Sequence, residues 1–431
     1  MHIAILLDDL SGGGVERTML TLAGGFLRRG HVVDLLLGRQ VGPLDKEVPE
    51  GARVVLLEEH SGFKARLAIA RADPRGVAGL AGPVLFARRK RLGHMLPRLP
   101  SLVSYLRRER PDTLVSAKLR PNLCAIWARD LADVATQVVV TERTSPTEHF
   151  PQEQARARHR AMPALMRRYY PRADHIVTVS RDLADDLARF AGLERGRIVA
   201  IYNPVVDARI DAAARQQPDH SWLISGAPPV VLGTGRIEPR KGFATLMRAF
   251  ALVRRQRPAR LVILGEGKMT EAGSRHQQEL AALAHELGIV EDVSFPGFKP
   301  NPYAYMARAA AFVLSSDYEG LPGVLIQAMA CGCPVVSTAC PTGPREILEG
   351  GQYGSLVPVG DHMRMAEAIA HDLDAPTPAA LLRERAWQFS VEAAVDAYLA
   401  LFRARQSADS VRNGGFACRL RTRRASGRGK A

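Results

Sequence analysis

Short apolar runs alternate with amphipathic segments along most of the chain. In the first half the apolar runs are IAILL, VVDLLL, VVLL, TLVSA, QVVVTER and HIVTVS, and a helical pattern at residues 119–131 separates the fourth from the fifth. The alternation begins again near residue 228 with PVVLGTG, RLVILGEG, VSFPGF, AAFVLSS and SLVPVG. Continuous apolar strands separated by helices are typical of a parallel sheet covered on both faces. The pattern therefore predicts an α/β protein with two doubly wound, parallel-sheet domains.

The segments between and beyond the two sets indicate the boundaries. The expected divisions are an N-terminal Rossmann-like domain (1–206), a polar linker (207–227), a C-terminal Rossmann-like domain (228–386), a C-terminal helix (387–405) and a basic tail (406–431). The linker contains Pro218 and Gly226. The last helix is predicted over residues 387–402 because apolar side chains recur there at helical spacing. The tail is rich in Gly, Ser and Arg and poor in apolar residues, so we expect it to be disordered.

The formal charge of +15 is concentrated in two places. Residues 64–110 hold twelve Lys or Arg against two acidic residues, and the tail holds seven against one. The apolar residues that alternate with arginine in residues 84–110 fit two interpretations: an interfacial helix on anionic lipid headgroups, or a helix packed on the N-terminal domain with a solvated basic face. Charge would let the tail contact a membrane or nucleic acid, but no motif for specific nucleic-acid recognition is present.

The ends and the cysteines indicate the compartment. The start, MHIAILLDDL, lacks a basic n-region and predicts a first strand and not a signal peptide, and no apolar stretch has the length of a membrane span. The five cysteines lack zinc spacing, so we expect them to be small apolar residues in a reducing environment. We therefore expect a cytoplasmic protein. The first interpretation of the basic segment would add peripheral contact with the inner face of the plasma membrane.

The stretch from residue 315 to residue 348 carries the strongest candidate chemistry. Glu319 stands before Gly-Leu-Pro-Gly, and an apolar helix, a small-residue turn and a short strand follow. The first N–H groups of a helix have no intrahelical partner, and with the helix dipole they form an anion site. A carboxylate beside a phosphate-binding helix end suits a ligand that has hydroxyls next to a diphosphate, such as a nucleotide sugar. The structural alternative is an ordinary loop–helix–strand unit with an incidental glutamate.

A second candidate element, GTGRIEPRKGF at residues 233–243, follows the first strand of the second domain. Gly233 and Gly235 let the chain turn closely at the carboxyl end of this strand, where ligands of open α/β sheets bind. Arg236 and Lys241 then supply two cations for one diphosphate. The structural alternative is solvated surface charge near a helix start.

Other candidates are weaker. The loop Gly12-Gly13-Gly14 lies between the first strand and the first helix, where glycine permits close backbone approach, and a plain tight turn is nearly as good an interpretation. His149 follows an N-domain strand and Glu346 follows a Pro-Thr-Gly-Pro turn, and we place Glu346 near the sugar as a hypothesis.

Taken together, these motifs resemble glycosyltransferase family 4 (glycosyl transferases group 1), which are retaining enzymes. The resemblance covers residues 1–405 in layout and is most specific in residues 233–243 and 315–348. It implies the GT-B fold, in which two Rossmann-like, doubly wound domains face each other across a cleft and the last helix crosses back to the N-terminal domain. It also implies that the glycine loop faces the acceptor and the diphosphate.

The resemblance assigns roles to individual residues. Glu319, Arg236 and Lys241 match the catalytic positions, with Glu319 holding sugar hydroxyls and the two cations neutralising the leaving diphosphate. The remaining donor-binding positions that it implies are Gly235, Gly265, Phe298, Gly320, Leu321, Pro322, Gly323, Val324 and Gln327. The family has a second glutamate, which binds both ribose hydroxyls, at the position of Gln327. Glutamine offers one acceptor oxygen, so we expect weaker donor binding with the chemistry retained.

The resemblance thus implies a retaining transfer from a nucleotide sugar, with a UDP-sugar favoured, to a glycan or polyprenyl-linked acceptor in cell-surface polysaccharide or glycoconjugate synthesis. It implies no metal or other cofactor, since the nucleotide sugar is a substrate. Two alternatives remain open at this point. One is a catalytically impaired GT-B protein that binds a partner at the membrane, and the other is a nucleotide-sugar epimerase of the same architecture.

Overall fold

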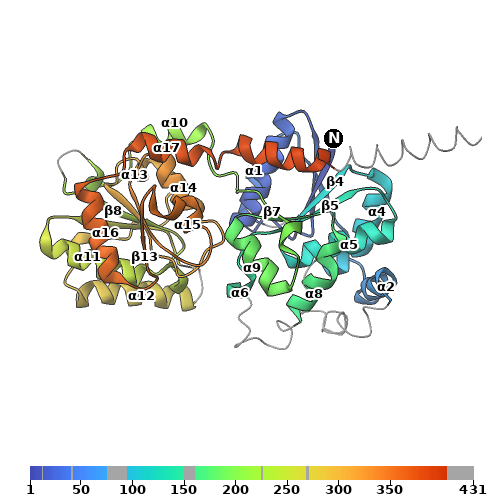
Figure 1. Ribbon diagram of the computed structural model, residues 1–431, viewed down its shortest axis with the longest axis horizontal. Helices are drawn as coiled ribbons and strands as arrows, with labels where there is room; N and C mark the ends of the chain where they lie inside the picture. Colours follow the sequence, from blue (N-terminus) through green and yellow to red (C-terminus); the bar gives the residue numbers. More distant parts are fainter. Residues whose placement is uncertain are drawn as a thin grey trace, which may run out of the picture.

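The computed structural model describes residues 1–11, 13–39, 42–74, 95–149, 161–224, 227–267 and 271–404. Two α/β lobes lie side by side, each built around its own parallel sheet (Figure 1). The predicted α/β architecture with two doubly wound domains is confirmed. The chain passes between the lobes twice, and both passages lie at the top of the view (Figure 1).

The sheet of the N-terminal domain has seven parallel strands in the order β3-β2-β1-β4-β5-β6-β7. The strands are β1 (His2–Leu7), β2 (Val32–Leu37), β3 (Arg53–Leu56), β4 (Thr113–Ala117), β5 (Gln137–Glu142), β6 (His175–Thr178) and β7 (Ile198–Ala200). Successive side chains of β1 enter opposite cores: Ile3 and Ile5 join one, and Ala4 joins the other. Both faces of β1 are buried, which explains why such strands appear in the sequence as continuous apolar runs.

Helices cover both faces of this sheet. They are α1 (Gly14–Arg28), α2 (Gly62–Ala72), α4 (Leu99–Glu109), α5 (Leu119–Ala132), α6 (Pro146–His149), α8 (Met162–Tyr169) and α9 (Arg181–Ala191). Side chains of α2, α4, α5, α8 and α9 join the core on one face, where Trp127 and Tyr169 meet edge to face. The opposite face is covered by α1 and by the last helix of the chain, residues 391–404.

The second sheet has six parallel strands in the order β10-β9-β8-β11-β12-β13. They are β8 (Val230–Thr234), β9 (Arg260–Leu264), β10 (Val293–Ser294), β11 (Ala311–Leu314), β12 (Val335–Thr338) and β13 (Ser355–Val357). Its helices are α10 (Arg209–Arg215), α11 (Phe243–Gln256), α12 (Glu271–Glu286), α13 (Tyr303–Met306), α14 (Gly323–Ala330), α15 (Pro344–Ile347), α16 (His362–Asp374) and α17 (Ala379–Trp387). Side chains of α11, α12 and α16 join the core on one face, and those of α10, α13, α14 and α17 join the core on the other.

The segment that was expected to be a polar linker is partly folded onto the second domain. Residues 209–215 form α10, and Ile210 is buried in the core that α14 and α17 also line. Leu223, in a short 3-10 turn, is buried in the same core. Polar residues lie around these two side chains in the sequence, so the sequence pattern does not indicate that Ile210 and Leu223 hold the segment on the second domain.

The last helix begins at residue 391, later than the predicted start. Trp387 ends α17, a turn follows, and the Ser390 hydroxyl accepts a hydrogen bond from the Ala393 N–H (3.2 Å), which caps the new helix. At this break the chain returns to the N-terminal domain. The Phe389 carbonyl accepts hydrogen bonds from the N–H groups of Val205 and Val206 (2.9 and 3.1 Å), so the two passages are joined to each other.

The basic segment contributes its apolar side chains to the N-domain core where it is described. Met95, Leu96, Leu99, Leu102 and Leu106 are each at most 4% exposed. The packed-helix interpretation therefore holds for residues 95–109, and these side chains cannot enter a lipid layer. Residues 75–94 and the tail after residue 404 lie outside the described residues. Among the described helices, none has the length and apolar content that crossing a membrane requires.

Candidate functional site

The candidate site lies where the strand order of the second sheet reverses. Strand β8 comes first in the chain but lies between β9 and β11. The chain goes from β8 to β9 on one side, and from β11 to β12 on the other side. Open parallel sheets bind their ligands at such a switch point, outside the carboxyl ends of the strands. Residues 235–242 follow β8 and residues 315–322 follow β11. The structure thus brings the two strongest sequence motifs to one place.

These two loops are fastened together through their backbones. Gly242 has a φ of 62°, and a side chain there would come within 2.0 Å of the Ser315 carbonyl oxygen. The Ser315 hydroxyl donates to the Lys241 carbonyl (2.8 Å), and the Asp317 N–H donates to the Arg240 carbonyl (2.8 Å). Only glycine tolerates both the conformation and the close approach at position 242. The loops therefore form one rigid unit that fixes the side chains they carry.

Glu319 is the centre of a cluster of charged groups. Its Oε1 lies 2.5 Å from Lys241 Nζ and accepts a hydrogen bond from the Ser316 hydroxyl at 2.8 Å. Its Oε2 lies 3.6 Å from the Arg240 guanidinium. The side chains of Lys241 and Glu319 are each 12% exposed. At this degree of burial each charge depends on its partner, because an unpaired buried charge is costly.

Arg236 and Arg240 extend this cluster through a second acid. Glu238 lies 2.6 Å from Arg240 and 3.6 Å from Arg236, whose side chain is 47% exposed. The sequence predicts Arg236 and Lys241 as the cations of this site. The structure adds Arg240 to the cluster, and it pairs with both acids. The charged run RIEPRK indicates in the sequence that several charges lie in this loop. Which arginine pairs with which carboxylate depends on how the loop folds.

The N-terminus of α14 follows Glu319 by four residues. Pro322 is its N-cap residue and supplies no side-chain hydrogen bond, and the Leu325 N–H donates to the Pro322 carbonyl (3.1 Å). The N–H groups of Gly323 and Val324 have no partner among the described residues and can bind an anion. Leu321 belongs to the second-domain core, and Val324 packs against it. Gly323 starts the helix with Val205 of the interdomain passage 3.8 Å from the site of its missing Cβ. The arrangement can bind a dianion between this helix end and the cations of the cluster.

The remaining donor-side candidates lie on neighbouring loops. Gly265 has a φ of 140°, and a Cβ there would be 1.8 Å from the Gly235 carbonyl oxygen, so glycine is needed at position 265, where β9 ends. The Gly265 N–H donates to the Gly297 carbonyl (3.0 Å), which ties this turn to the loop of Phe298. Phe298 is 57% exposed, and its N–H donates to Glu266 Oε1 at 3.3 Å. An exposed aromatic ring on an anchored loop is suited to contact a flat base.

Gln327 lies on the first half of α14 and points its amide to Tyr303. Its Nε2 donates to the Tyr303 hydroxyl at 3.2 Å, which leaves the carbonyl oxygen of the amide as the acceptor for a ligand. Burial raises the pKa of Tyr303, so its hydroxyl keeps its proton at neutral pH.

The other N-domain candidates are placed only in part. Gly13 is the N-cap residue of α1 and Gly14 its first residue, while Gly12 lies outside the described residues. Glu16, in the first turn of α1, is 2% exposed and pairs with Lys118, in accord with a helix-start charge. His149 ends the short helix α6, and its side chain is not among those described.

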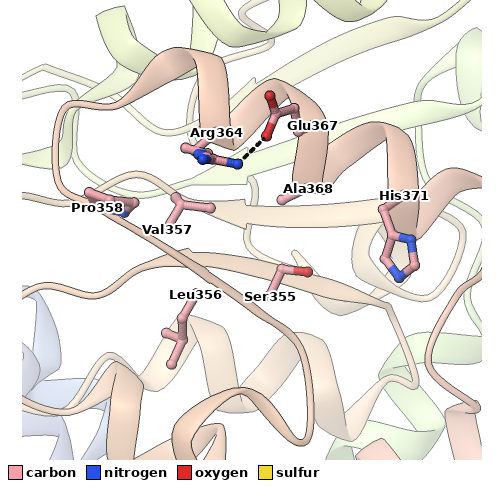
Figure 2. A pocket seen from close by; sticks show the side chains of 8 residues that line it. All are labelled: Ser355, Leu356, Val357, Pro358, Arg364, Glu367, Ala368 and His371. Carbon is pink, nitrogen blue, oxygen red and sulfur yellow. Dashed lines mark hydrogen bonds and ion pairs between the residues drawn. The ribbon is translucent and has the colours of Figure 1, made fainter.

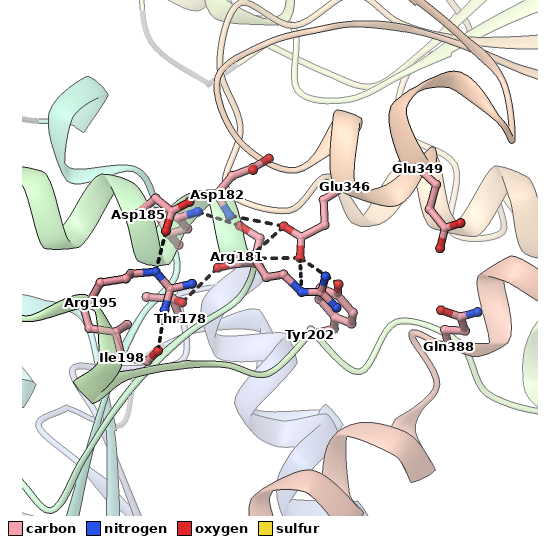
Figure 3. A network of polar contacts seen from close by, with 12 residues as sticks. Thr178, Arg181, Asp182, Asp185, Arg195, Ile198, Tyr202, Glu346, Glu349 and Gln388 are labelled. Carbon is pink, nitrogen blue, oxygen red and sulfur yellow. Dashed lines mark hydrogen bonds and ion pairs between the residues drawn. The ribbon is translucent and has the colours of Figure 1, made fainter.

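Glu346, the remaining hypothesis from the sequence, is held at the domain interface. Its carboxylate accepts hydrogen bonds from the Arg181 N–H (2.8 Å) and the Asp182 N–H (3.3 Å) at the start of α9. The Tyr202 hydroxyl donates to it as well, at 2.7 Å (Figure 3). These partners belong to the N-terminal domain and to the segment that leaves it. The hypothesis that Glu346 lies near a sugar stays a prediction, and in the structure its carboxylate faces the start of α9.

A separate cavity lies on the outer part of the second domain, between β13 and α16 (Figure 2). Its lining residues are Ser355, Leu356, Val357, Pro358, Arg364, Glu367, Ala368 and His371. None of the side chains of the Glu319 cluster lines it. Arg364 and Glu367 already pair with each other across its rim at 3.0 Å.

A buried acid with a raised pKa lies in the N-terminal domain at the end of β5. Glu142 is 7% exposed and accepts hydrogen bonds from the Tyr170 hydroxyl and from Asn122 Nδ2 (3.2 Å). Burial raises the pKa of Glu142 to about 7, although these hydrogen bonds oppose the shift. Near neutral pH this carboxyl group is thus partly protonated inside the fold.

This pKa makes the stability of the protein fall with rising pH. Between the usual pKa of a glutamate and about 7, the folded chain keeps a proton that the unfolded chain has lost. The free energy of unfolding therefore decreases through this window and levels off above it, by an amount on the order of 3 kcal/mol for this group. We expect Glu142→Gln to lose less stability than the wild type between pH 5 and pH 8. Asp372, whose pKa burial raises to about 6, keeps some slope in both proteins.

Urea unfolding midpoints at the two pH values measure this difference. The exposed Glu367→Gln variant is the control for a lost carboxylate. An unchanged pH dependence in Glu142→Gln would show that Glu142 titrates in the folded protein as an ordinary glutamate.

Two family models match the two domains of the chain. Residues 12–209 match the family model "Glycosyltransferase Family 4", and residues 228–374 match "Glycosyl transferases group 1". The two matches cover the body of both domains, and the predicted resemblance is confirmed. The chain belongs to the family 4 glycosyltransferases of group 1.

Individual relatives share about a third of their residues with this chain over the matched parts. The chain is similar to an N-acetylgalactosaminyltransferase of Campylobacter jejuni named as acting on a diphospho-undecaprenol-linked saccharide, with 32% identity over 250 residues, 58% of this chain and 64% of that protein. It is also similar to the lipopolysaccharide core biosynthesis glycosyltransferase LpsE of Rhizobium meliloti, with 33% identity over 220 residues, 50% of this chain and 56% of that protein. Each match spans less than two thirds of the relative.

Solved structures confirm the GT-B fold. HepE of Anabaena, in complex with UDP, superposes with a TM-score of 0.70 over 94% of this chain and 100% of its own, at 21% identity. Sucrose-phosphate synthase of Thermosynechococcus elongatus gives a TM-score of 0.71 over 95% of this chain and 100% of its own, also at 21% identity.

Proposed function

We propose that the protein is a retaining glycosyltransferase that moves a sugar from a UDP-sugar to a lipid-linked or glycan acceptor in cell-surface polysaccharide or glycoconjugate synthesis. The observation that carries this proposal is the cluster at the switch point. It combines two carboxylates, three cations and the N-terminus of α14 within two loops. Family membership and relatives that act in lipopolysaccharide core and undecaprenol-linked saccharide synthesis support it.

In this proposal Lys241, Arg240 and Arg236 stabilise the charge that develops on the leaving diphosphate. The free N–H groups at the start of α14 bind the same diphosphate. Glu319 then accepts hydrogen bonds from sugar hydroxyls and holds the reacting carbon in place. The leaving diphosphate takes the proton of the acceptor hydroxyl, so that bond breaking and bond formation occur on the same face of the sugar. We propose that these cations neutralise the diphosphate without a metal ion.

The choice of UDP rests on likeness to nucleotide complexes. Structures of HepE with UDP and with UDP-glucose share the fold of this chain. A thermal-shift screen of UDP, GDP, ADP, CDP and dTDP, each with EDTA and with magnesium, tests both the base and the metal independence. UDP is expected to raise the melting temperature most, and equally in EDTA and in magnesium. Stabilisation by another nucleotide alone, or only with magnesium, would contradict the respective part of the proposal.

Gln327 gives a prediction about donor affinity. Because its Nε2 is bonded to Tyr303, one amide oxygen remains for the two ribose hydroxyls. Gln327→Glu supplies a second acceptor and a negative charge, and hydrogen bonds to charged groups are stronger than neutral ones. We expect the donor KM to fall roughly threefold to tenfold with kcat unchanged, since the ribose is remote from the reacting carbon.

Initial rates of UDP release over a range of donor concentrations measure this effect. Gln352→Glu, an exposed position outside the cluster, makes the same chemical change and is the control. A donor KM in Gln327→Glu equal to that of the control would mean that residue 327 does not face the ribose.

For the acceptor side we propose peripheral contact with the inner face of the membrane. The exposed face of α2 carries Phe63 (74% exposed) and Leu67 (40% exposed) one turn apart, with Lys64 beside them. An aromatic and an aliphatic side chain next to a cation suit anionic headgroups. Sedimentation with phosphatidylglycerol vesicles, compared with phosphatidylcholine vesicles, tests this. Equal sedimentation of the wild type and a Phe63→Asp variant would show that α2 does not contact the vesicles.

A further inference from the structure

Glu346 links the two domains through a charged contact that no motif assigns. Arg181 and Asp182 form the first turn of α9 in the N-terminal domain, and their N–H groups donate to the Glu346 carboxylate of the C-terminal domain (Figure 3). The side chain of Glu346 is 9% exposed. A carboxylate at a helix N-terminus satisfies donors that have no intrahelical partner and interacts favourably with the helix dipole. The contact is thus stabilising only while the domains are together.

Tyr202 completes the contact from the passage between the domains. Its hydroxyl donates to Glu346 Oε1, and its ring lies 4.8 Å from that of Phe389 in the return passage. Burial, together with the bond to Glu346, raises the pKa of Tyr202 to about 12, so the hydroxyl keeps its proton at neutral pH. Both passages between the domains are therefore coupled to the same carboxylate.

The segment that carries Glu346 is also packed on the donor loop. Gly343 has a φ of 94°, and a Cβ there would be 2.7 Å from Pro322 Cδ and 3.0 Å from the Gly320 carbonyl oxygen. The Thr342 hydroxyl donates to the backbone carbonyl of Glu319. Only two residues separate Gly343 from Glu346. A movement of Glu346 away from α9 cannot leave the loop of Glu319 unchanged.

The N-terminal domain touches the same loop a second time. The Ser180 hydroxyl caps α9 by accepting from the Leu183 N–H (3.1 Å) and donates to the Gly320 carbonyl (3.3 Å). A side chain at Gly320 would lie 2.3 Å from the Arg143 carbonyl oxygen, so glycine permits this approach. The start of α9 thus contacts both Glu346 and the residue next to Glu319.

From these contacts we propose that Glu346 is an interdomain latch: a positioning residue whose binding to the start of α9 holds the domains closed and fixes the loop of Glu319. Closure of the domains then also fixes the geometry of the Glu319 cluster. When the latch opens, the domains separate at this edge and the Glu319 loop loses its contact with Ser180. The latch itself rests on the contacts above, and its effect on turnover rests on the proposed function.

Hydrogen exchange of the N–H groups of Arg181 and Asp182 tests the latch without any ligand. The variants are Glu346→Gln and Tyr202→Phe, and the control is Glu367→Gln, an exposed glutamate of α16. Tyr202→Phe keeps the ring and the fold while it removes one donor. We expect exchange at the start of α9 to be roughly tenfold faster in Glu346→Gln, less accelerated in Tyr202→Phe and unchanged in the control. Wild-type exchange at α9 in Glu346→Gln would overturn the latch.

Enzyme kinetics then tests the consequence. In Glu346→Gln we expect the Kd for UDP to stay within about twofold of the wild type, while kcat for UDP-sugar turnover falls about tenfold. A kcat equal to that of the control, with faster exchange at α9, would show that closure does not set the reactive geometry. If UDP binds neither protein, the proposed function fails, and the exchange experiment still decides whether the latch exists.

Discussion

Replacement of Glu319 by glutamine is expected to lower kcat for sugar transfer by about 10²–10³-fold with little change in the affinity for UDP. The carboxylate lies at the carboxyl end of β11, where the Ser316 hydroxyl and Lys241 orient it. Its hydrogen bonds to sugar hydroxyls act on the part of the donor that changes in the transition state. Nucleotide binding relies instead on the cations and the start of α14. Initial rates of UDP release, together with UDP titration by calorimetry, separate the two effects.

The same experiment distinguishes an enzyme from an inactive binding protein. Glu319→Ala and Glu319→Gln should both lower turnover by about 10²-fold or more in preparations that still bind UDP. Glu367→Gln should retain wild-type rates, because its carboxylate is exposed and pairs only with Arg364 on the surface. Turnover that survives both Glu319 changes would assign the sugar contact to another residue. A wild-type protein that binds UDP without any turnover would support the binding protein.

The sheets and the position of the site could be predicted because each depends on local patterns. Buried parallel strands give continuous apolar runs, and the eleven runs of the sequence correspond to eleven of the thirteen described strands. Helix α11 begins at Phe243 because Gly242, in the left-handed region, precedes it, and apolar residues then follow helical spacing. The glycine turns after β8 and β11 identify the switch point, where ligands of such sheets bind.

What could not be predicted depends on contacts between distant segments. Nothing near Glu346 in the sequence indicates that α9, about 165 residues earlier, supplies its partners. The apolar positions at residues 95–106 satisfy the pattern of a membrane-bound helix as well as that of a buried one, because both environments select the same residues. Only the packed structure distinguishes them. In the same way, Ile210 and Leu223 anchor the 207–227 segment through a core that sequence composition does not show.

Lys241 should carry the largest share of diphosphate binding, since it is the least exposed of the three cations in the cluster. Its Nζ faces Glu319 Oε1, and this pairing holds the cation in place for the donor. Lys241→Met keeps most of the side-chain volume and removes the charge. We expect the affinity for UDP to fall by about 10²-fold, in the range for truncating one partner of a buried charge pair.

The loss of Lys241 also leaves Glu319 with Arg240 at 3.6 Å as its remaining charged partner. A poorly compensated buried carboxylate should lower the free energy of unfolding by roughly 1–3 kcal/mol. The double variant Lys241→Met/Glu319→Gln removes both charges, so it should recover part of this stability and none of the UDP affinity. Urea unfolding and UDP titration of the four proteins form a double-mutant cycle. Recovery of UDP binding in the double variant would mean that Lys241 acts by neutralising Glu319, and that the diphosphate is bound by Arg236, Arg240 and α14.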